Sequence, residues 1–320
     1  MQVYECPVCY ENTDCHRLLC NHYLCNSCIL QLNPLICPLC RSTLYVISND
    51  DEMFELIRKD GFALKHIVKQ TREICLEAVR HHFFSLVYVR NQTQEICLEA
   101  VKNFGLALQF VNEQDDIICL EAVKQNGLAL CYVVNQKDYI CLEAVKQNGK
   151  ALEFVVFQNE EICLAAVRNN PWSLRYVIDK TRKICMEAIS LEGLTIEFVE
   201  DQDEEFCIAA VKQNAWAIIY MDEKNITHDV CLEAVKQNGR ILSYIGSKEV
   251  ISLDIVLEAV KQNGSSIEYV RDEFMTREVC IEAVRQNGYY LKFIAKKYRT
   301  WEVCKLAIKT NEEVLNLVNG

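Results

Sequence analysis

Apolar residues recur with a helical period along most of the chain, from residue 51 to residue 320. If the cysteine of the repeated ICLEA segment is position 0, apolar residues occupy positions −1, 0, +1, +3 and +4. Position +3 is alanine in every repeat except the first, where it is Leu56, and position +4 is always valine or isoleucine. This spacing predicts a short α-helix in each repeat, with one buried face and one solvated face.

Position 0 occurs twelve times, which predicts twelve structural repeats. The step is 22 residues as far as Cys207, and then 24, 25, 24 and 24 residues. The residues at position 0 are Met53, Cys75, Cys97, Cys119, Cys141, Cys163, Cys185, Cys207, Cys231, Val256, Cys280 and Cys304. Because helices this short do not persist alone, we expect the repeats to stack against one another.

Each repeat continues into a second short element. Glycine stands at position +8 in eight repeats, and it predicts a left-handed residue that ends the first helix. Leucine or isoleucine at +11, mostly aromatic residues at +13 and an aliphatic residue or methionine at +14 describe another helical face, with the aromatic residues in the core. We therefore predict a mostly α fold, an α-solenoid of about twelve two-helix repeats. A strand-plus-helix horseshoe is the alternative, because positions +9, +11 and +13 alternate.

The charge of the chain limits its partners. The 320 residues include 34 basic and 45 acidic ones, a net charge of −11, which disfavours binding to nucleic acid or to an anionic membrane and suits a basic partner. Glutamate at +2 and lysine at +5 are expected to pair within one helix on the solvated face. No apolar run approaches the length of a membrane span, so we expect a cytoplasmic or nuclear protein.

Eighteen of the nineteen cysteines fall into two groups. Ten stand at position 0 of the repeats, where one thiol per repeat cannot chelate a metal and a buried small hydrophobic residue is expected. Eight lie before residue 41. Seven of these, with one histidine, form the series Cys6, Cys9, Cys20, His22, Cys25, Cys28, Cys37 and Cys40. These four ligand pairs predict two closed structural zinc sites, without which so short a segment would not fold.

The spacing C-x2-C-x10-C-x-H-x2-C-x2-C-x8-C-x2-C resembles that of the C3HC4 RING finger family. Chance clustering or one simpler zinc finger are the alternatives. The resemblance implies that one zinc is bound by Cys6, Cys9, Cys25 and Cys28, and the other by Cys20, His22, Cys37 and Cys40. RING ubiquitin ligases bind a ubiquitin-charged conjugating enzyme and position its thioester for attack by lysine, with no covalent intermediate of their own.

The resemblance also assigns a docking groove for the conjugating enzyme. Val8, Leu32 and Pro38 occupy the groove positions of the family, and Arg41 follows the last ligand, where an arginine often bridges conjugating enzyme and ubiquitin. The alternative is that the first three residues pack a small core and that Arg41 is a solvated charge.

We therefore expect a RING-type zinc finger in residues 1–46 and a helical repeat domain in residues 47–320. The leading hypothesis is a ubiquitin ligase that contains two structural zinc ions and whose repeats recruit a protein substrate. The competing hypothesis is a non-enzymatic adaptor stabilised by zinc. The repeats resemble a short helical repeat of uncharacterised function found in giant DNA viruses, which implies a viral protein acting inside a host cell.

Position +12 varies in every repeat, although the core register does not. Because packing leaves recognition to the variable positions, this position predicts a surface that binds the substrate. Its candidate residues are Gln109, Glu153, Arg175, Glu197, Ile219, Glu268 and Lys292. The lengthened connections at residues 223–227, 247–252 and 272–276 are expected to lie on one edge and to belong to the same partner surface.

Overall fold

The computed structural model describes residues 3–9, 12–17, 23–25, 28, 39, 50–67 and 70–319. The chain forms two compact units, Met1–Gln147 (the N-terminal unit) and Asn148–Gly320 (the C-terminal unit). The boundary expected between residues 46 and 47 lies outside the described residues and stays a prediction.

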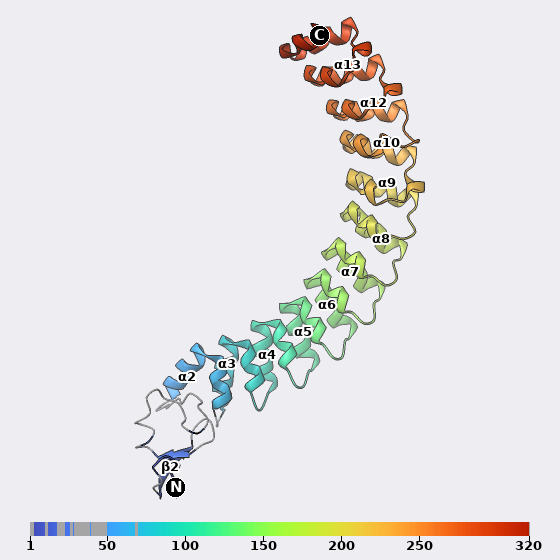
Figure 1. Ribbon diagram of the computed structural model, residues 1–320. Coiled ribbons are helices and arrows are strands. Elements are labelled where there is room, and N and C mark those ends of the chain that lie inside the picture. The colour runs from blue at the N-terminus through green and yellow to red at the C-terminus, as the bar shows by residue number, and fades with distance from the viewer. Residues whose placement is uncertain are drawn as a thin grey trace. The chain divides into compact units, whose positions relative to one another are not determined.

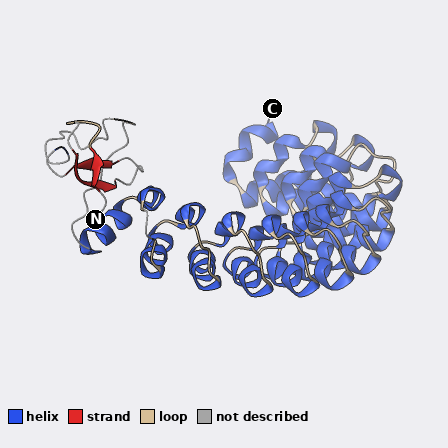
Figure 2. Cartoon of the chain, turned by 90° about the horizontal axis from the view of Figure 1, so that it is seen from below, coloured by secondary structure: helices blue, strands red, loops and turns tan. Residues whose placement is uncertain are grey.

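Strands are found only near the N-terminus of the described chain (Figure 2). The strands β1 (Val3–Glu5), β2 (Asn12–Arg17) and β3 (Tyr23–Cys25) form a small antiparallel sheet in the order β1-β2-β3. The register pairs Tyr4 with Thr13 and Cys15 with Cys25. The sheet therefore connects the segment of the first cysteine pair to that of the third pair.

Twelve α-helices of ten residues follow in the described chain, each running from position −3 to position +6 of a repeat (Figure 1). They are α2 (Asp50–Lys59), α3 (Arg72–His81), α4 (Gln94–Asn103), α5 (Asp116–Gln125), α6 (Asp138–Gln147), α7 (Glu160–Asn169), α8 (Arg182–Leu191), α9 (Glu204–Gln213), α10 (His228–Gln237), α12 (Leu253–Gln262), α13 (Arg277–Gln286) and α14 (Trp301–Thr310). The prediction of twelve helical repeats is confirmed. Within each compact unit, successive helices stack side by side (Figure 1).

In ten repeats the second element is a 3₁₀ helix and not an α-helix, and in the ninth and twelfth repeats a 3₁₀ helix is continued by a short α-helix. These helices are η1 (Gly61–His66), η2 (Phe83–Tyr88), η3 (Gly105–Phe110), η4 (Gly127–Tyr132), η5 (Gly149–Phe154), η6 (Pro171–Tyr176), η7 (Gly193–Phe198), η8 (Ala215–Tyr220), η10 (Gly239–Ile241), η11 (Gly264–Tyr269), η13 (Gly288–Phe293) and η15 (Glu312–Val314). Short helices also lie in the longer connections and at the C-terminal end: η9 (Glu223–Asn225), α11 (Leu242–Ile245), η12 (Asp272–Phe274), η14 (Lys296–Tyr298) and α15 (Leu315–Asn319). No described repeat contains a strand, so the horseshoe alternative is wrong for this part of the chain.

Side-chain caps set the boundaries of the two elements. A threonine, aspartate or asparagine at position −4 usually caps the α-helix, as Asp115 does by accepting a 2.8 Å hydrogen bond from the N–H of Ile118. The asparagine at +7 takes an extended backbone and caps the 3₁₀ helix, as Asn126 does for the N–H of Leu128 at 3.1 Å. The three-residue period of the 3₁₀ helix then aligns +8, +11 and +14, which are buried in most repeats.

The expected role of the glycines at +8 is wrong. Gly105, Gly149 and Gly193 are not in the left-handed region; each is the first residue of a 3₁₀ helix. A Cβ atom at Gly149 would lie 2.5 Å from the carbonyl oxygen of Ala166, which is position +3 of the following repeat. Glycine is required because two repeats approach closely at this point, and the small residue at +3 belongs to the same contact.

Two sets of glutamines join successive repeats. Gln213 at position +6 accepts a 2.6 Å hydrogen bond from the N–H of Gly193 and donates one to the carbonyl oxygen of Leu191 at 3.1 Å. Gln92 at position −5 donates to the carbonyl oxygens of Leu86 and Phe110, at 3.0 and 2.9 Å. These side chains add hydrogen bonds to backbone groups at or near the ends of the α-helices and 3₁₀ helices of neighbouring repeats.

Nine of the ten cysteines at position 0 are buried small residues, as predicted, and Cys304 is half-buried. Cys119, Cys141 and Cys207 are at most 4% exposed. Burial raises the pKa of each of these thiols to about 11. The buried thiols are therefore almost entirely protonated near neutral pH and poorly nucleophilic.

Alkylation of the native protein is expected to separate these thiols from Cys131, which is exposed. At about pH 8, iodoacetamide should modify Cys131 well before Cys119 or Cys141, because their burial restricts access and keeps the thiolate fraction low. Peptide mass mapping over time gives the order of modification. Equal rates at the three sites would contradict the burial described above.

The aromatic residues at +13 are less buried than predicted. Phe110 is half-buried, while Tyr132 and Tyr220 are 37% and 38% exposed. The reason is the 3₁₀ geometry, which aligns +13 with +10 and leaves it beside the buried row of +8, +11 and +14. These rings lie at the border of the core.

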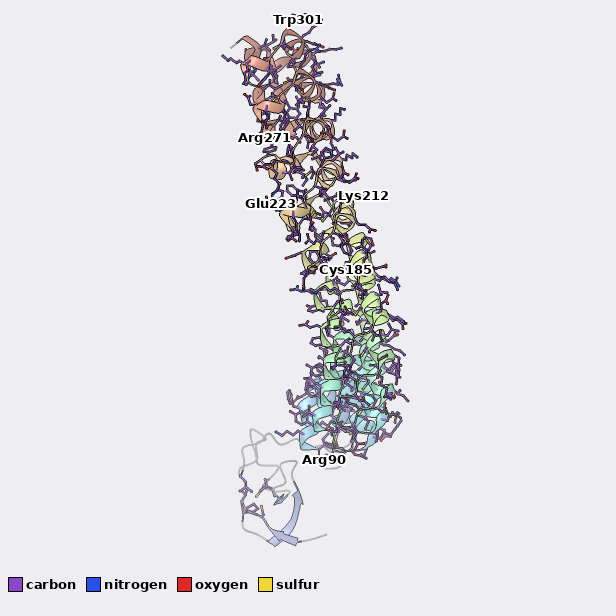
Figure 3. All side chains as sticks on the ribbon, turned by 90° about the vertical axis from the view of Figure 1, so that its right-hand side faces the viewer. Arg90, Cys185, Lys212, Glu223, Arg271 and Trp301 are labelled. Carbon is purple, nitrogen blue, oxygen red and sulfur yellow. The ribbon has the colours of Figure 1, made fainter. Side chains whose placement is uncertain are left out.

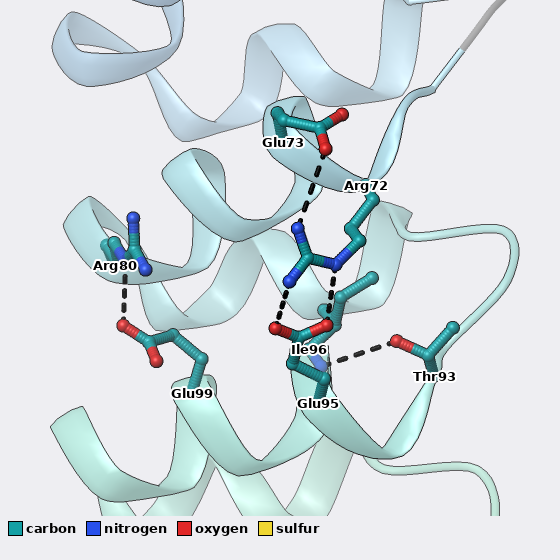
Figure 4. A network of polar contacts seen from close by, with 7 residues as sticks. All are labelled: Arg72, Glu73, Arg80, Thr93, Glu95, Ile96 and Glu99. Carbon is teal, nitrogen blue, oxygen red and sulfur yellow. Dashed lines mark hydrogen bonds and ion pairs between the residues drawn. The ribbon is translucent and has the colours of Figure 1, made fainter.

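Charged side chains join neighbouring repeats as well as residues of one helix. With lysine at +5 the predicted pair within one helix occurs, as between Lys124 and Glu121 at 3.0 Å. With arginine at +5 the partner can instead be position +2 of the next repeat, as for Arg80 and Glu99 at 2.7 Å (Figure 4). Arg72 at position −3 likewise pairs with Glu95 of the next repeat (Figure 4). Because these ion pairs are exposed, we expect them to contribute little to the free energy of folding and mainly to favour one orientation of neighbouring repeats.

His228 takes the place of arginine at position −3 in α10. Its ring nitrogens lie 2.9 Å from a carboxylate oxygen of Asp254 in α12 and 3.1 Å from one of Asp229. Hydrogen bonds to Asp229 and Asp254 raise the pKa of His228 above its usual value of 6.5. Stabilisation by the charged ring is therefore complete below pH 6.5 and is lost as the pH rises through the higher pKa of the folded state.

The wild type should therefore be more stable than His228→Gln at about pH 6, and this difference in the free energy of unfolding should decrease as the pH rises to about 8. The decrease should be less than about 1 kcal/mol because the pair is exposed. Urea unfolding of both proteins at each pH measures this difference, and effects of other titrating groups cancel. A difference that grows with pH would contradict the assigned contact.

Candidate functional site

Three of the predicted zinc ligands come together at the N-terminal sheet. The sulfur atoms of Cys6, Cys9 and Cys28 all lie within 4.8 Å of one another. Cys6 is fully buried and Cys28 is 8% exposed, while Cys9 is half-buried. Thiolates on a tetrahedral zinc at about 2.3 Å are about 4 Å apart, so this donor set fits such an ion in both chemistry and spacing. All three belong to the set expected on the first zinc.

The other predicted residues of this module are only partly described. Cys25, the fourth residue of that set, ends β3 opposite Cys15. Val8 is 40% exposed between the two cysteines of the first pair, in a position accessible to a partner. The predicted residues Cys20, His22, Leu32, Cys37, Pro38, Cys40 and Arg41 lie outside the described residues.

The predicted partner residues at position +12 are all exposed. They are Gln109 in the N-terminal unit and Glu153, Arg175, Glu197, Ile219, Glu268 and Lys292 in the C-terminal unit. Aromatic rings hold the cations in place: the guanidinium of Arg175 lies 5.7 Å from the ring centre of Phe198, and the ammonium of Lys292 lies 4.1 Å from that of Tyr289. Such cation–π contacts restrict the two side chains and leave them facing solvent.

The lengthened connections meet on one edge of the C-terminal unit, as predicted. Glu223 and Arg271 lie on this edge, opposite Lys212 (Figure 3). Glu223 and Ile226 from one connection and residues 247–250 from the next line a hollow of about 470 Å³. Lys248, which also lines this hollow, forms a 3.1 Å ion pair with Glu223.

A group of exposed apolar side chains, which the sequence did not predict, lies on the connections between repeats of the C-terminal unit. Val156, Phe157 and Ile178 of the C-terminal unit are 63%, 81% and 74% exposed. They stand at positions +15 and +16. Position +15 is also apolar at Val134 of the N-terminal unit, whereas several other repeats have polar residues there, such as Asn112 and Asp222. The signal that could have found them is this change from polar to apolar at a position outside the core register.

No helix of the described residues is long and apolar enough to cross a membrane.

Comparison with known proteins identifies the repeats. The family described as Domain of unknown function (DUF4116) matches residues 93–135, 139–181, 181–226, 203–251, 228–275, 252–299 and 276–319. No RING family model matched the chain. No curated protein and no solved structure matches it. Because the matched segments cover more than half of the 320 residues, the chain belongs to the DUF4116 family of repeated domains.

Proposed function

We propose that the protein is a RING-type ubiquitin ligase. Its N-terminal module would hold two structural zinc ions and bind a ubiquitin-charged conjugating enzyme, while its helical repeats recruit a protein substrate. In this proposal it acts in the cytoplasm or nucleus of a host cell, and its substrate is a protein and not a nucleic acid or a membrane. The repeats would recruit the substrate, and the zinc module would present the charged conjugating enzyme to it.

One observation carries the zinc module: the approach of Cys6, Cys9 and Cys28 within 4.8 Å, with two of the three buried. Buried cysteine side chains grouped in this way suit a metal ion, because the ion would neutralise the charge of their thiolates. Their place in the eight-residue spacing C-x2-C-x10-C-x-H-x2-C-x2-C-x8-C-x2-C favours a two-zinc RING over a single finger. A zinc held by protein side chains alone is structural, so the residues of the chain would act by positioning.

The proposed groove consists of Val8, Leu32 and Pro38. The exposure of Val8 supports a role in docking, because a residue that only packs the module would be covered. Arg41 would reach both the conjugating enzyme and ubiquitin through its planar guanidinium, which donates to two acceptors at once. Holding the thioester in one conformation raises the rate of attack by a lysine without any covalent step on this chain.

Reconstituted ubiquitin transfer tests the proposal. The purified protein is incubated with ubiquitin, activating enzyme and a panel of conjugating enzymes, and chain formation is followed by gel electrophoresis. We expect chains with at least one conjugating enzyme, strongly reduced chains with Arg41→Ala and none with Cys25→Ser. Absence of chains with every conjugating enzyme would favour the alternative, a zinc-stabilised adaptor without activity.

A further inference from the structure

Two adjoining hollows lie between successive connections of the C-terminal unit. The smaller has a volume of about 330 Å³ and is lined by Val156, Phe157, Ile178 and Ile184 among others. The larger has a volume of about 600 Å³ and is lined by Ile178, Glu200, Asp201 and Asp203 among others. Ile178 lines both hollows, so they share a wall. The smaller hollow is mainly apolar, and the larger one is lined by three acidic and three basic side chains, the basic ones being Lys180, Arg182 and Lys224.

The apolar side chains of this edge are not required by the fold. The N–H of Ile178 donates a 3.0 Å hydrogen bond to Gln158, and the N–H of Asp222 donates a 3.1 Å bond to Gln202 in the same way. The backbone of position +15 is therefore held alike whether its side chain is apolar or charged. At 74% exposure, the side chain of Ile178 gains little by burial within this chain.

The same edge has a surplus of negative charge. Residues 156–161, 178–183 and 200–205 contain eight acidic and three basic residues. All three basic residues are already paired with acidic ones: Lys180 with Glu200, Arg182 with Asp203 and Glu205, and Lys183 with Glu160. Lys224, which also lines the larger hollow, is paired with Asp222. The remaining charge of the edge is acidic, and it would attract a cation brought by a partner.

We propose that this edge binds a segment of a partner protein in which a large apolar side chain is followed by lysine or arginine. The apolar side chain would fill the hollow lined by Val156, Phe157 and Ile184. The cation would lie over Asp201, beside the Lys180–Glu200 pair, in the neighbouring hollow. Because successive helices pack about 9 Å apart, a segment in the polyproline II conformation, with three residues per turn and a rise of about 3.1 Å per residue, would present the two side chains on one face if they are three residues apart.

This inference deepens the recruiting role proposed for the repeats and rests on it. Its test contains no ubiquitin component, however, so a failure of ubiquitin transfer and a failure of this binding can be told apart. Only binding of a short peptide to the intact chain is measured.

Fluorescence anisotropy with synthetic peptides tests the proposal. One labelled peptide carries leucine followed three residues later by two arginines in a glycine–serine background; a second has glutamates for the arginines, and a third has serine for the leucine. We expect the first peptide to bind at least about tenfold more tightly than the other two, with an affinity that falls as salt is added. Equal affinities, or no binding of the first peptide, would overturn the proposal.

Variants of the exposed residues locate the site. Ile178→Ser and Asp201→Lys should each weaken binding of the arginine peptide by about tenfold or more. Leu253→Ser is the matched control, because Leu253 is another exposed apolar residue of the C-terminal unit, at 43%, and it lines neither hollow. Unchanged binding in the first two variants would overturn the assignment. Self-association of the wild type that Ile178→Ser abolishes would also overturn it, because a second copy would then occupy the edge.

Discussion

Gly239→Ala is expected to destabilise the repeats by about 2–3 kcal/mol. A Cβ atom at Gly239 would overlap the carbonyl oxygen of Ala259 and lie 3.0 Å from its carbonyl carbon. Both are backbone atoms of α12, so no rotamer change can relieve the contact. The two repeats would have to separate, which would also weaken the 2.7 Å hydrogen bond from the N–H of Gly239 to Gln262. Urea unfolding followed by circular dichroism measures the loss.

Ala215→Gly is the matched control, because alanine naturally occupies position +8 of that repeat and is 5% exposed. We expect this variant to lose about 1 kcal/mol or less, mostly through the greater freedom of glycine in the unfolded chain. If Gly239→Ala is no more destabilising than Ala215→Gly, then close approach of the repeats is not the reason for glycine at this position.

Removal of zinc is expected to abolish ubiquitin transfer while the repeats stay folded. In the proposed function, two zinc ions supply the folding free energy of the N-terminal module, whereas the repeats are held by apolar packing and by hydrogen bonds between neighbours. A strong chelator should release about two zinc ions per chain, measured with a metal-sensitive dye. Thermal unfolding of the helices, followed by circular dichroism, should hardly change.

Cys28→Ser tests the same point by substitution, with Cys131→Ser as its control. Cys28 belongs to the group of three thiols, whereas Cys131 is an exposed cysteine in a 3₁₀ helix of the repeats. We expect Cys28→Ser to lose bound zinc and ubiquitin transfer and Cys131→Ser to keep both. Equal zinc content in the two variants would contradict the assignment of Cys28 as a ligand.

The sequence predicts the α-helices of the repeats well because their signal is local. Alanine at +3 and valine or isoleucine at +4 describe one face of a helix, and the twelve described helices follow that register. The burial of the cysteines at position 0 could be predicted for the same reason. Each of these features depends on the period of one helix and on the exclusion of water from one face.

Features that depend on contacts between repeats were harder to predict. Gly149 looks like the end of a helix in the sequence, but its role is set by the carbonyl oxygen of Ala166 in the next repeat. Gln213 looks like a solvated residue, yet it joins two repeats through the N–H of Gly193 and the carbonyl oxygen of Leu191. Neither contact has a signature in a single repeat. The recurrence of glutamine at position +6 in six of the twelve repeats was the available signal.

The candidate functional residues also include some that the sequence predicts and some that it does not. The C-x-x-C pairs of the N-terminal segment predict which side chains could share a metal, and Cys6, Cys9 and Cys28 do approach one another. The apolar edge at Phe157 and Ile178 was not predicted, because its two hollows form only when successive connections lie beside each other. Spacing along the chain could not indicate that arrangement.

Discharge of ubiquitin from a charged conjugating enzyme to free lysine tests the central claim most directly, because it needs no substrate. The thioester between conjugating enzyme and ubiquitin is formed first, and the activating enzyme is then inhibited. Loss of the thioester is followed with and without the protein. We predict that the wild type accelerates discharge by about tenfold or more for at least one conjugating enzyme, and that Val8→Glu, with its zinc content intact, does not. An unchanged rate of discharge for every conjugating enzyme in the panel would contradict the account.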